Sequence, residues 1–369
     1  MTDTPTPPEQ DPLRPRLMLF LSVDMSGSTA LKNSHDRTST TQPLAWLDFM
    51  QEFHREFPNM LGKRIKDPEL REEFGACVPG GKESCEPDLW KSLGDELIFK
   101  LELSNHRQAA LVVGAFWHTL ADYNKQLRTK LDNLKPDKFP DLNTRDAMGV
   151  KGTAWVAGFP VTNATILAQG SQGEEDYIGP QIDIGFRLGK HANRRKLIVS
   201  VDLALLLVEF TNPITVYFDG CVPIKGVLQD KPYPLFWISL NPTNWNNITG
   251  FNSDGSTLLE DSLYGPCQSN AVKRYARSFL ETEANRTLMV PFIVGDPVFN
   301  KKPPRYDEEL RMVQQSYGPR PSDDGNQTED QPEINEASPP LNHFLEEVNA
   351  LEQQSTPSPR PVEHFDSSD

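Results

Sequence analysis

Hydrophobic and polar residues follow one another along the first two thirds of the chain in blocks that predict both strands and helices. The run Leu17–Val23 is apolar apart from one serine and ends at Asp24, which is typical of a buried strand. Apolar residues then recur every three positions over residues 44–53, which predicts a helix. Two apolar stretches flank Gly94 and Asp95, and this pattern predicts a β-hairpin with glycine in its tight turn.

The same alternation continues to about residue 240. Ser104 is expected to cap a long helix, because apolar residues recur on one helical face from Val112 to Leu127. The apolar run at 288–294 is a strand candidate interrupted by Pro291. The order of these elements predicts an α+β sandwich with a largely antiparallel sheet. The pattern predicts further strands at 150–157, 197–201, 214–218 and 235–240 and further helices at 182–191, 202–209 and 270–282.

Composition changes at both ends of this region and suggests four segments. Residues 1–15 contain five prolines and are expected to form a flexible arm, and residues 16–240 to form the folded domain. Residues 241–300 are expected to be a partly ordered C-terminal extension. Residues 301–369 hold 15 acidic residues, 6 basic residues and 10 prolines, so they cannot bury enough apolar surface to offset the entropy of ordering. Within that disordered acidic tail only residues 341–351 are amphipathic.

Charge and hydropathy exclude several classes of protein. The 369 residues carry a net charge of −15, which argues against a nucleic-acid-binding protein, because phosphate binding needs a basic face. A nucleotide substrate stays open, since bound divalent metals offset such repulsion. No apolar run approaches the roughly 20 residues of a membrane span. The N-terminus lacks a secretory signal, and the four scattered cysteines are typical of free thiols. We therefore expect a cytoplasmic protein without a membrane span.

Two aspartates are candidates for metal binding because of where they stand. Asp24 ends a buried strand, and Asp95 lies at the tip of the predicted hairpin. Carboxylates at the ends of adjacent strands can converge, and two of them can hold a pair of divalent ions roughly 3.5–4 Å apart. The small residues 26–29 allow backbone N–H groups to approach a triphosphate. Taken singly, each aspartate is equally typical of a turn or a cap.

Four segments of the chain, in this order, resemble motifs of the class III nucleotide cyclases. The sequence FLSVDMSGST at 20–29 resembles the first metal motif of that family, and KSLGD at 91–95 resembles the second. The sequence DYIGPQIDIGFRL at 176–188 resembles the base-reading and transition-state segment, and residues 224–238 resemble the last strands. The resemblance covers about residues 16–240 and implies a class III cyclase-like (ferredoxin-like) sandwich.

The resemblance also implies a role for each matching residue. The metal ligands of two Mn²⁺ or Mg²⁺ ions per site are implied to be Asp24, Asp95 and the carbonyl of Met25. The base contacts implied by the family are Lys91 and Asp176. The turn residues Gly27, Ser28 and Thr29 correspond to the nucleotide-binding part of the first motif. Charge that builds on the α-phosphate is implied to be stabilised by Arg187, since a guanidinium suits a planar group of oxygens.

Asp183 departs from the family pattern, which has an asparagine there to orient the ribose. A carboxylate beside developing phosphate charge repels that charge unless it is paired or protonated, although it can accept a hydrogen bond from a sugar hydroxyl. The alternative is a surface ion pair between Asp183 and Arg187, four residues apart on one helix. The substitution leaves open whether the chain turns over substrate in the usual way.

The residues of the first motif and the domain organisation also resemble those of the Pycsar antiphage cyclases. These enzymes make cyclic UMP or cyclic CMP to activate a partner effector. This resemblance implies a pyrimidine nucleotide cyclase that uses UTP, with CTP next, and releases pyrophosphate. The family also implies a homodimer with shared sites, because the metal aspartates come from one subunit and the arginine from the other. Two alternatives are an adenylate or guanylate cyclase, favoured by Lys91 with Asp176, and a non-catalytic nucleotide-binding regulatory module, favoured by Asp183.

Overall fold

The computed structural model describes residues 11–33, 45–74, 85–133, 148–167, 175–209, 214–226, 228–239, 266–283 and 287–317. All of them belong to one compact unit within residues 1–318. The expectations for most of the flexible arm, for residues 241–265 and for the tail from residue 318 onward lie outside the described residues, as does the amphipathic segment 341–351.

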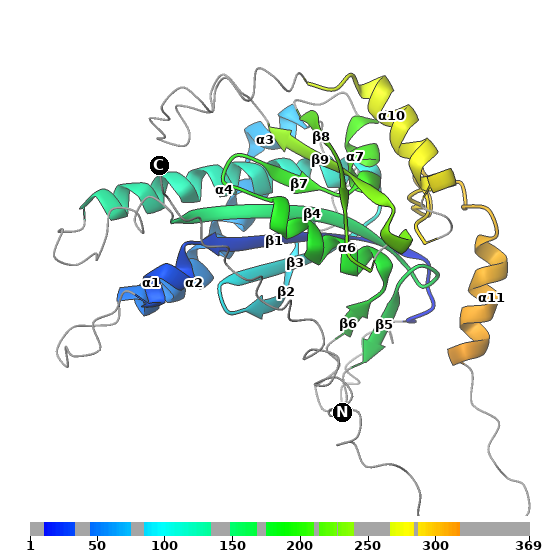
Figure 1. Cartoon of the computed structure of the whole chain (residues 1–369), viewed down its shortest axis with the longest axis horizontal. Helices are drawn as coiled ribbons and strands as arrows, with labels where there is room; N and C mark the ends of the chain where they lie inside the picture. Colours follow the sequence, from blue (N-terminus) through cyan, green and yellow to red (C-terminus); the bar gives the residue numbers. More distant parts are fainter. Residues whose placement is uncertain are drawn as a thin grey trace, which may run out of the picture. The chain divides into compact units, whose positions relative to one another are not determined.

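A seven-stranded sheet forms the centre of this unit (Figure 1). The strand order is β2-β3-β1-β4-β7-β9-β8, and β4–β7 is the one parallel pair among these described strands. The predicted α+β sandwich with a mostly antiparallel sheet is therefore confirmed. The seven strands are β1 (Arg16–Ser26), β2 (Asp88–Leu93), β3 (Glu96–Leu103), β4 (Gly149–Phe159), β7 (Leu197–Val199), β8 (Thr215–Pro223) and β9 (Pro232–Ser239).

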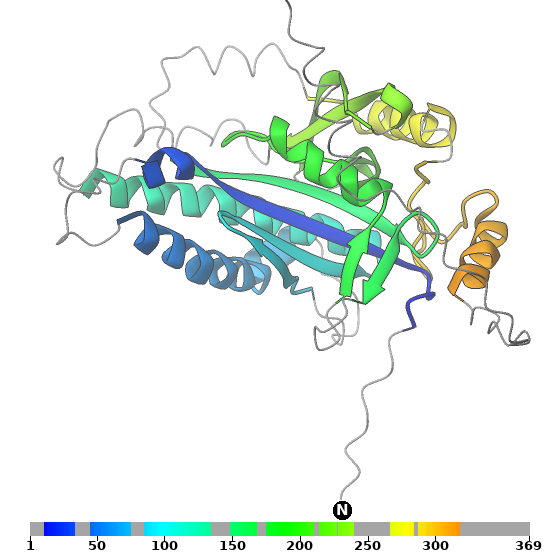
Figure 2. The same ribbon diagram turned by 60° about the horizontal axis from the view of Figure 1, so that its bottom comes forward.

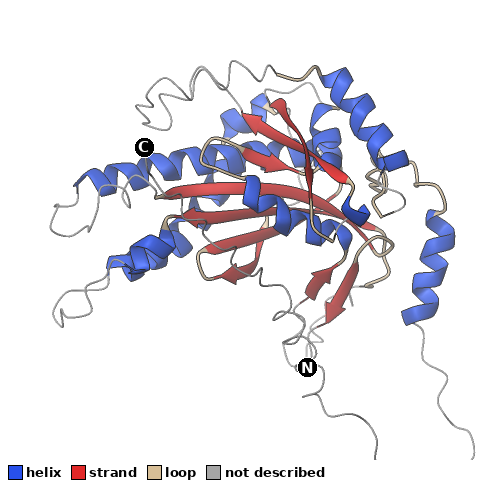
Figure 3. Ribbon diagram, viewed as in Figure 1, coloured by secondary structure: helices blue, strands red, loops and turns tan. Residues whose placement is uncertain are grey.

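A second sheet consists of two short antiparallel strands, β5 (Ala164–Leu167) and β6 (Glu175–Ile178), which lie apart from the main sheet (Figure 3). The hydrophobic pattern did not predict them, because a strand of four residues carries too little periodicity. The α-helices are α1 (Ser28–Asn33), α2 (Ala45–Ile65), α3 (Pro68–Glu73), α4 (His106–Asn133), α6 (Pro180–Leu188), α7 (Val201–Val208), α10 (Ser269–Ser278) and α11 (Tyr306–Tyr317). Shorter helical turns are η2 (Gly189–His191), η3 (Leu228–Asp230) and η4 (Phe279–Glu283).

Strand β1 separates two hydrophobic clusters. Leu19 and Leu21 belong to the larger cluster, which they share with apolar residues of α2, α4 and α7. Phe20 points to the other face, into a smaller cluster with Trp155 and Ile182, and α6 covers that side (Figure 2). Successive side chains of a strand point to opposite faces, so a strand buried on both faces is apolar throughout. The continuous apolar run of the sequence therefore has a direct structural cause.

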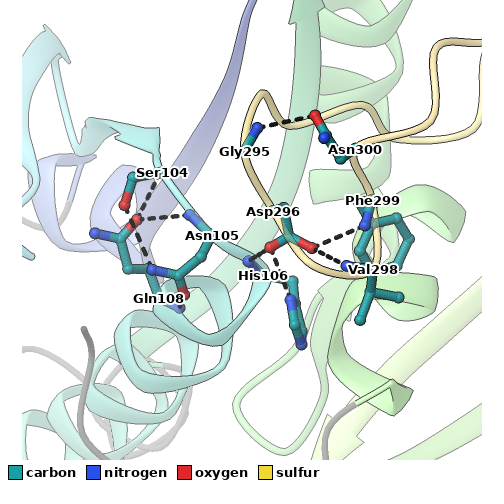
Figure 4. Close-up of polar contacts among 9 residues, drawn as sticks. All are labelled: Ser104, Asn105, His106, Gln108, Gly295, Asp296, Val298, Phe299 and Asn300. Carbon is teal, nitrogen blue, oxygen red and sulfur yellow. Dashed lines mark hydrogen bonds and ion pairs between the residues drawn. The ribbon is translucent and has the colours of Figure 1, made fainter. Parts of the chain in front are cut away.

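Helix α4 begins with a reciprocal cap one residue beyond the predicted one. Asn105 Oδ1 accepts a hydrogen bond from the backbone N–H of Gln108 at 3.1 Å, and Gln108 Oε1 accepts one from the backbone N–H of Asn105 at 3.4 Å (Figure 4). The prediction of Ser104 as the cap is wrong, because asparagine is as good a cap and glutamine three residues later completes the capping box.

A loop of the C-terminal extension caps the same helix from far along the chain. Asp296 Oδ2 accepts hydrogen bonds at 2.8 Å from both the backbone N–H and Nδ1 of His106, the first residue of α4 (Figure 4). Its other oxygen accepts from the backbone N–H groups of Val298 and Phe299. Burial by itself raises the pKa of Asp296, but these hydrogen bonds outweigh it and lower the pKa to about 2.

The helix expected at 270–282 is present as α10 followed by η4, but two other expectations for this part of the chain differ from the structure. Residues 288–294 form no strand, since Pro291 removes a backbone donor and the segment runs irregularly. The described chain continues past the expected boundary at residue 300 into α11, whose Tyr306 is buried and donates a hydrogen bond to the carbonyl of Phe159 at 3.4 Å. None of the described helices combines the length and apolar character required to cross a bilayer.

Candidate functional site

Asp24 and Asp95 line one cleft of about 230 Å³ at the end of the main sheet. Asp24 is near the end of β1, and Asp95 is in the turn between β2 and β3. The turn is held against β1 by a hydrogen bond from the backbone N–H of Met25 to the carbonyl of Asp95 at 3.0 Å. The preceding Gly94 has φ +70°, a conformation that favours glycine and allows the tight turn. Local turn chemistry and strand pairing together bring the two carboxylates to one cleft.

Each of these aspartates faces a lysine. The distance from Lys151 Nζ to Asp24 Oδ2 is 3.1 Å, and that from Lys32 Nζ to Asp95 Oδ2 is 3.6 Å. Asp95 Oδ2 also accepts a short hydrogen bond from the hydroxyl of Ser28. The side chains of Asp24 and Asp95 are 33% and 29% exposed, so both carboxylates remain accessible from the cleft.

A third carboxylate, Glu96, lies in the same cleft and was not singled out from the sequence. It pairs with Asp24 across β1 and β3, and its Oε1 accepts a hydrogen bond from the hydroxyl of Ser22 at 2.5 Å. Burial raises the pKa of Glu96, the Ser22 hydrogen bond opposes this, and the charges of Asp24 and Asp95 raise it further. The sequence offered one indication of Glu96, because this residue directly follows Asp95. Only the strand register shows that Glu96 lies opposite Asp24.

The remaining residues of the first motif take different positions. The side chain of Met25 is buried in the larger hydrophobic cluster. Gly27 has φ +79° and lets the chain turn out of β1 into α1. Ser28 is buried beside Asp95, whereas Thr29 is exposed. Ser28 therefore holds a carboxylate of the cleft without being among the described lining residues, and Gly27 contributes backbone conformation.

The two residues that the resemblance assigns to the base form a pair of their own. Lys91 Nζ on β2 lies 2.7 Å from Asp176 Oδ1 on β6 and 4.6 Å from the ring centre of Trp90. Tyr177, which follows Asp176 on β6, links this strand to the main sheet. Its hydroxyl accepts a hydrogen bond from Lys100 Nζ on β3 at 3.0 Å. Among the described residues that line the Asp24 cleft, neither Lys91 nor Asp176 is present.

Asp183 and Arg187 form a third group, on α6. Their closest polar atoms, Arg187 Nη1 and Asp183 Oδ2, are 3.8 Å apart, which matches the expected pairing of residues four positions apart on a helix. Arg187 Nη1 is buried and has no hydrogen-bond partner within the described part of the chain. The neighbouring Phe186 and Gly189 line the Asp24 cleft, but Arg187 is not among its described lining residues.

A buried polar network fixes the start of α6. Gln181 Nε2 donates a hydrogen bond to Asp202 Oδ2 at 2.6 Å, and Gln181 Oε1 accepts one from Asn163 Nδ2 at 2.7 Å. The side chain of Asp202 also accepts a hydrogen bond from the hydroxyl of Ser200, which precedes α7. This network ties α6 to α7 and to the turn after β4, so the direction in which α6 presents Arg187 is set by the interior.

The donor chemistry of the cleft fits a small hard cation. Asp24, Asp95 and Glu96 offer only oxygen ligands, which Mg²⁺ and Mn²⁺ prefer. Within the described residues no three acidic, histidine or cysteine side chains converge into a complete metal site. Mg²⁺ is commonly bound through one or two protein carboxylates together with substrate phosphates, and two accessible aspartates match that arrangement.

Of three comparisons with known proteins, the one with solved structures finds similar chains. No family model matches this chain, and no curated protein matches its sequence. Several solved structures are similar. An adenylyl cyclase from P. aeruginosa has a TM-score of 0.41 at 11% identity, over 61% of this chain and 95% of that one. The guanylate cyclase domain of a protein from Catenaria anguillulae, solved with GTP, has a TM-score of 0.37 at 10% identity, over 61% and 98%. Adenylate cyclases from Trypanosoma brucei, in their monomeric state, have a TM-score of 0.37 at 12% identity, over 67% and 95%.

Proposed function

We propose that this protein is a metal-dependent nucleotide cyclase that converts a nucleoside triphosphate into a 3′,5′-cyclic nucleotide and pyrophosphate. The observation that carries the proposal is that Asp24 and Asp95, from two separate motifs, line one accessible cleft. The contact between Lys91 and Asp176, also from separate motifs, supports it independently. A chance resemblance in sequence would not bring residues of separate motifs into contact. Here the fold does so for two pairs of residues, as expected if the motifs form one site.

The reaction requires the ribose 3′ oxygen to attack the α-phosphorus while the bond from that phosphorus to the pyrophosphate oxygen breaks. Asp24 and Asp95 would hold the divalent cations, which when bound would offset the charge of the triphosphate and acidify the 3′ hydroxyl. Arg187 donates hydrogen bonds to the α-phosphate oxygens as negative charge builds there. Asp183 accepts a hydrogen bond from a sugar hydroxyl in place of the usual asparagine.

The proposed active unit is a homodimer with shared sites. Arg187 is not among the described residues that line the cleft of its own chain, although its Nη1 is buried without a hydrogen-bond partner within the described residues. A second copy of the chain that turns its α6 toward the cleft supplies the missing guanidinium. Twofold symmetry makes two such sites, each with the aspartates of one subunit and the arginine of the other.

We further propose a pyrimidine substrate, UTP before CTP, and a role for the cyclic product as a messenger to an antiphage effector. This part rests on the resemblance of residues 20–29 to the Pycsar cyclases. At the base end, Lys91 and Asp176 offer a donor and an acceptor beside the ring of Trp90; this set can read the edge of a base and does not by itself select a pyrimidine.

The test is incubation of the full-length protein with each of the four ribonucleoside triphosphates and Mn²⁺ or Mg²⁺. Chromatography against cyclic nucleotide standards identifies the product, and pyrophosphate release gives the rate. We expect cyclic UMP in greatest yield and cyclic CMP next. Asp24→Asn, which keeps the shape of the side chain and removes its charge, is the matched control and is expected to be inactive. The absence of cyclic product from every nucleotide contradicts the proposal.

Two other functions are favoured by specific contacts and are separated by the same assay. The Lys91–Asp176 pair favours a purine substrate, and cyclic AMP or cyclic GMP as the main product would establish that reading. The contact of Asp183 with Arg187 at 3.8 Å favours a regulatory module that binds nucleotide without turnover. That module shows nucleotide binding by calorimetry and releases no pyrophosphate.

A further inference from the structure

The carboxylate of Asp24 has a cation from its own sheet. Lys151 lies on β4 directly opposite Asp24 in the strand register, and its Nζ is 3.1 Å from Asp24 Oδ2. Glu96 lies opposite Asp24 on the other side, on β3. The three side chains therefore form a row across adjacent strands, and all three line the cleft. Lys151 is the member of this row that brings positive charge.

Lys151 and a divalent cation compete for the same oxygen atom. The Lys151 ammonium takes up lone-pair capacity of Asp24 Oδ2 at 3.1 Å, and its positive charge opposes a divalent cation that approaches the same oxygen. The side chain of Lys151 is 26% exposed and that of Asp24 is 33% exposed, so the ammonium can leave without opening the core. Lysine has a flexible four-carbon stem and three donors, which suits a cation that changes partners.

We propose that Lys151 holds the Asp24 carboxylate while no divalent cation is bound and passes to an oxygen of the triphosphate when a cation enters with the nucleotide. The inference rests on the proposed function and concerns the order of binding at that site. A positive charge in the cleft repels a free metal ion and attracts a polyphosphate. Lys151 therefore makes the binding of metal and nucleotide depend on each other, in the sense that each strengthens the other.

Lys190 provides a matched control. It lines the same cleft and carries the same charge, but it forms no ion pair with any residue that the structure describes. Lys190→Met removes one positive charge from the cleft without releasing a carboxylate. Lys151→Met removes the same charge and leaves Asp24 free. Both changes keep most of the apolar stem, so each preserves most of the packing that the stem makes.

The experiment measures binding of Mn²⁺ alone to the full chain by electron paramagnetic resonance or calorimetry, and then binding of inorganic triphosphate in the presence of Mn²⁺. Inorganic triphosphate is chosen because it is independent of base preference. We expect Lys151→Met to bind free Mn²⁺ about tenfold more tightly than the unmodified protein and to bind Mn²⁺-triphosphate about tenfold more weakly. Lys190→Met is expected to change Mn²⁺ affinity by about threefold at most.

Lys151→Arg keeps the charge and is expected to restore weak binding of free Mn²⁺. Lys151→Gln is the second neutral variant and replaces Lys151→Met if thermal melting shows that the methionine variant is unfolded. Equal Mn²⁺ affinities in the Lys151 and Lys190 variants overturn the inference, and so does the absence of Mn²⁺ binding in all of them. Cyclic product from the unmodified protein together with equal affinities overturns only the role of Lys151. The expected affinities without any cyclic product overturn only the proposed function.

Discussion

Carboxylates at the cleft and carboxylates in the interior of this protein are held in different ways. Asp24 and Asp95 are about one-third exposed and face lysine ammonium groups. Asp202 and Asp296 are buried, and both oxygens of each accept hydrogen bonds from groups of fixed position. The two pairs are chemically alike, so the difference lies in their partners and their contact with water.

The partners explain what each pair can do. Asp202 accepts hydrogen bonds from Gln181, Ser200 and the backbone N–H of Leu203. If any of these donors moved away, a buried polar group would be left without a hydrogen-bond partner. Burial raises the pKa of Asp202. Asp24 has a lysine on a flexible stem, which water or a ligand can replace. The interior pair therefore contributes to stability, and the cleft pair is free to exchange partners.

The largest expected effect is the loss of the proposed cyclase activity in variants of Arg187 and Asp24 that keep their stability. We expect Arg187→Ala to lower kcat by about 10² to 10³-fold, by analogy with the loss of a group that stabilises transition-state charge. Asp24→Ala is expected to abolish activity, while its unfolding free energy changes by less than about 1 kcal/mol because the side chain is partly exposed. Pyrophosphate release and urea denaturation measure the two effects.

Mixing the two inactive proteins tests whether sites are shared. Random exchange of subunits makes half of all dimers mixed, and each mixed dimer holds one intact site, so about a quarter of the original activity is expected to return. A mixture that stays inactive, although size-exclusion chromatography shows exchanged dimers, contradicts the proposed arrangement of Asp24 and Arg187. A mixture of two Asp24→Ala preparations is the control.

The next effect concerns stability in the interior. Asp202→Ala leaves the side chains of Gln181 and Ser200 buried without their partner, and we expect the free energy of unfolding to fall by about 2–4 kcal/mol. Asp183→Ala on the exposed side of α6 is the matched control, with an expected change below about 0.5 kcal/mol, because Asp183 is 62% exposed. Equal losses in the two variants would remove the distinction between buried and exposed carboxylates.

A smaller effect depends on pH. The pKa of Asp296 is lowered from 3.8 to about 2 in the folded protein, so its ionised form stabilises the fold fully above pH 3.8 and loses this contribution as the pH falls through about 2. Asp296→Asn is expected to cost about 2 kcal/mol at pH 7. Urea denaturation at pH 7 and pH 3 is expected to show that the difference from the unmodified protein falls by about half. A difference that does not change with pH contradicts the role of the ionised carboxyl.

The smallest effect is expected at Lys32. Its Nζ is 3.6 Å from Asp95, and its side chain is 36% exposed, which is typical of an ion pair that contributes little. Lys32→Met is expected to change the free energy of unfolding by less than about 0.5 kcal/mol and Mn²⁺ affinity by less than about threefold. Calorimetry of Mn²⁺ binding and urea denaturation check both values. A tenfold change in affinity would make Lys32 an equal of Lys151 and would remove the difference between the two lysines.

The fold was predictable where the signal is local. The apolar run at Leu17–Val23 predicted β1, and glycine before Asp95 predicted the hairpin, because burial on both faces and a positive φ each leave a mark in neighbouring residues. The strands β5 and β6 were missed, since strands of four residues carry little periodicity. The cap of α4 was misplaced by one residue, because serine and asparagine are both good caps and only the contact with Gln108 decides between them.

The residues of the candidate site were likewise predictable only where the sequence signal is local. The sequence singled out Asp24, Asp95 and Arg187 because their motifs are continuous stretches that can be read without a structure. Glu96 and Lys151 were missed, since their roles depend on which residues stand opposite Asp24 on the neighbouring strands. A shift of one residue in the β1–β3 register would turn Glu96 to the other face of the sheet, and such a shift in the β1–β4 register would do the same to Lys151.

The sequence by itself determined the seven strands of the main sheet in their order along the chain, among them the buried strand that ends in Asp24 and the hairpin that carries Asp95. These features depend on residues within a few positions of one another. Only the tertiary structure decided that Lys151 faces Asp24, and that Asp296 caps a helix that begins 190 residues earlier. Such contacts depend on strand register and on the closure of long loops, and neither leaves a periodic trace along the chain.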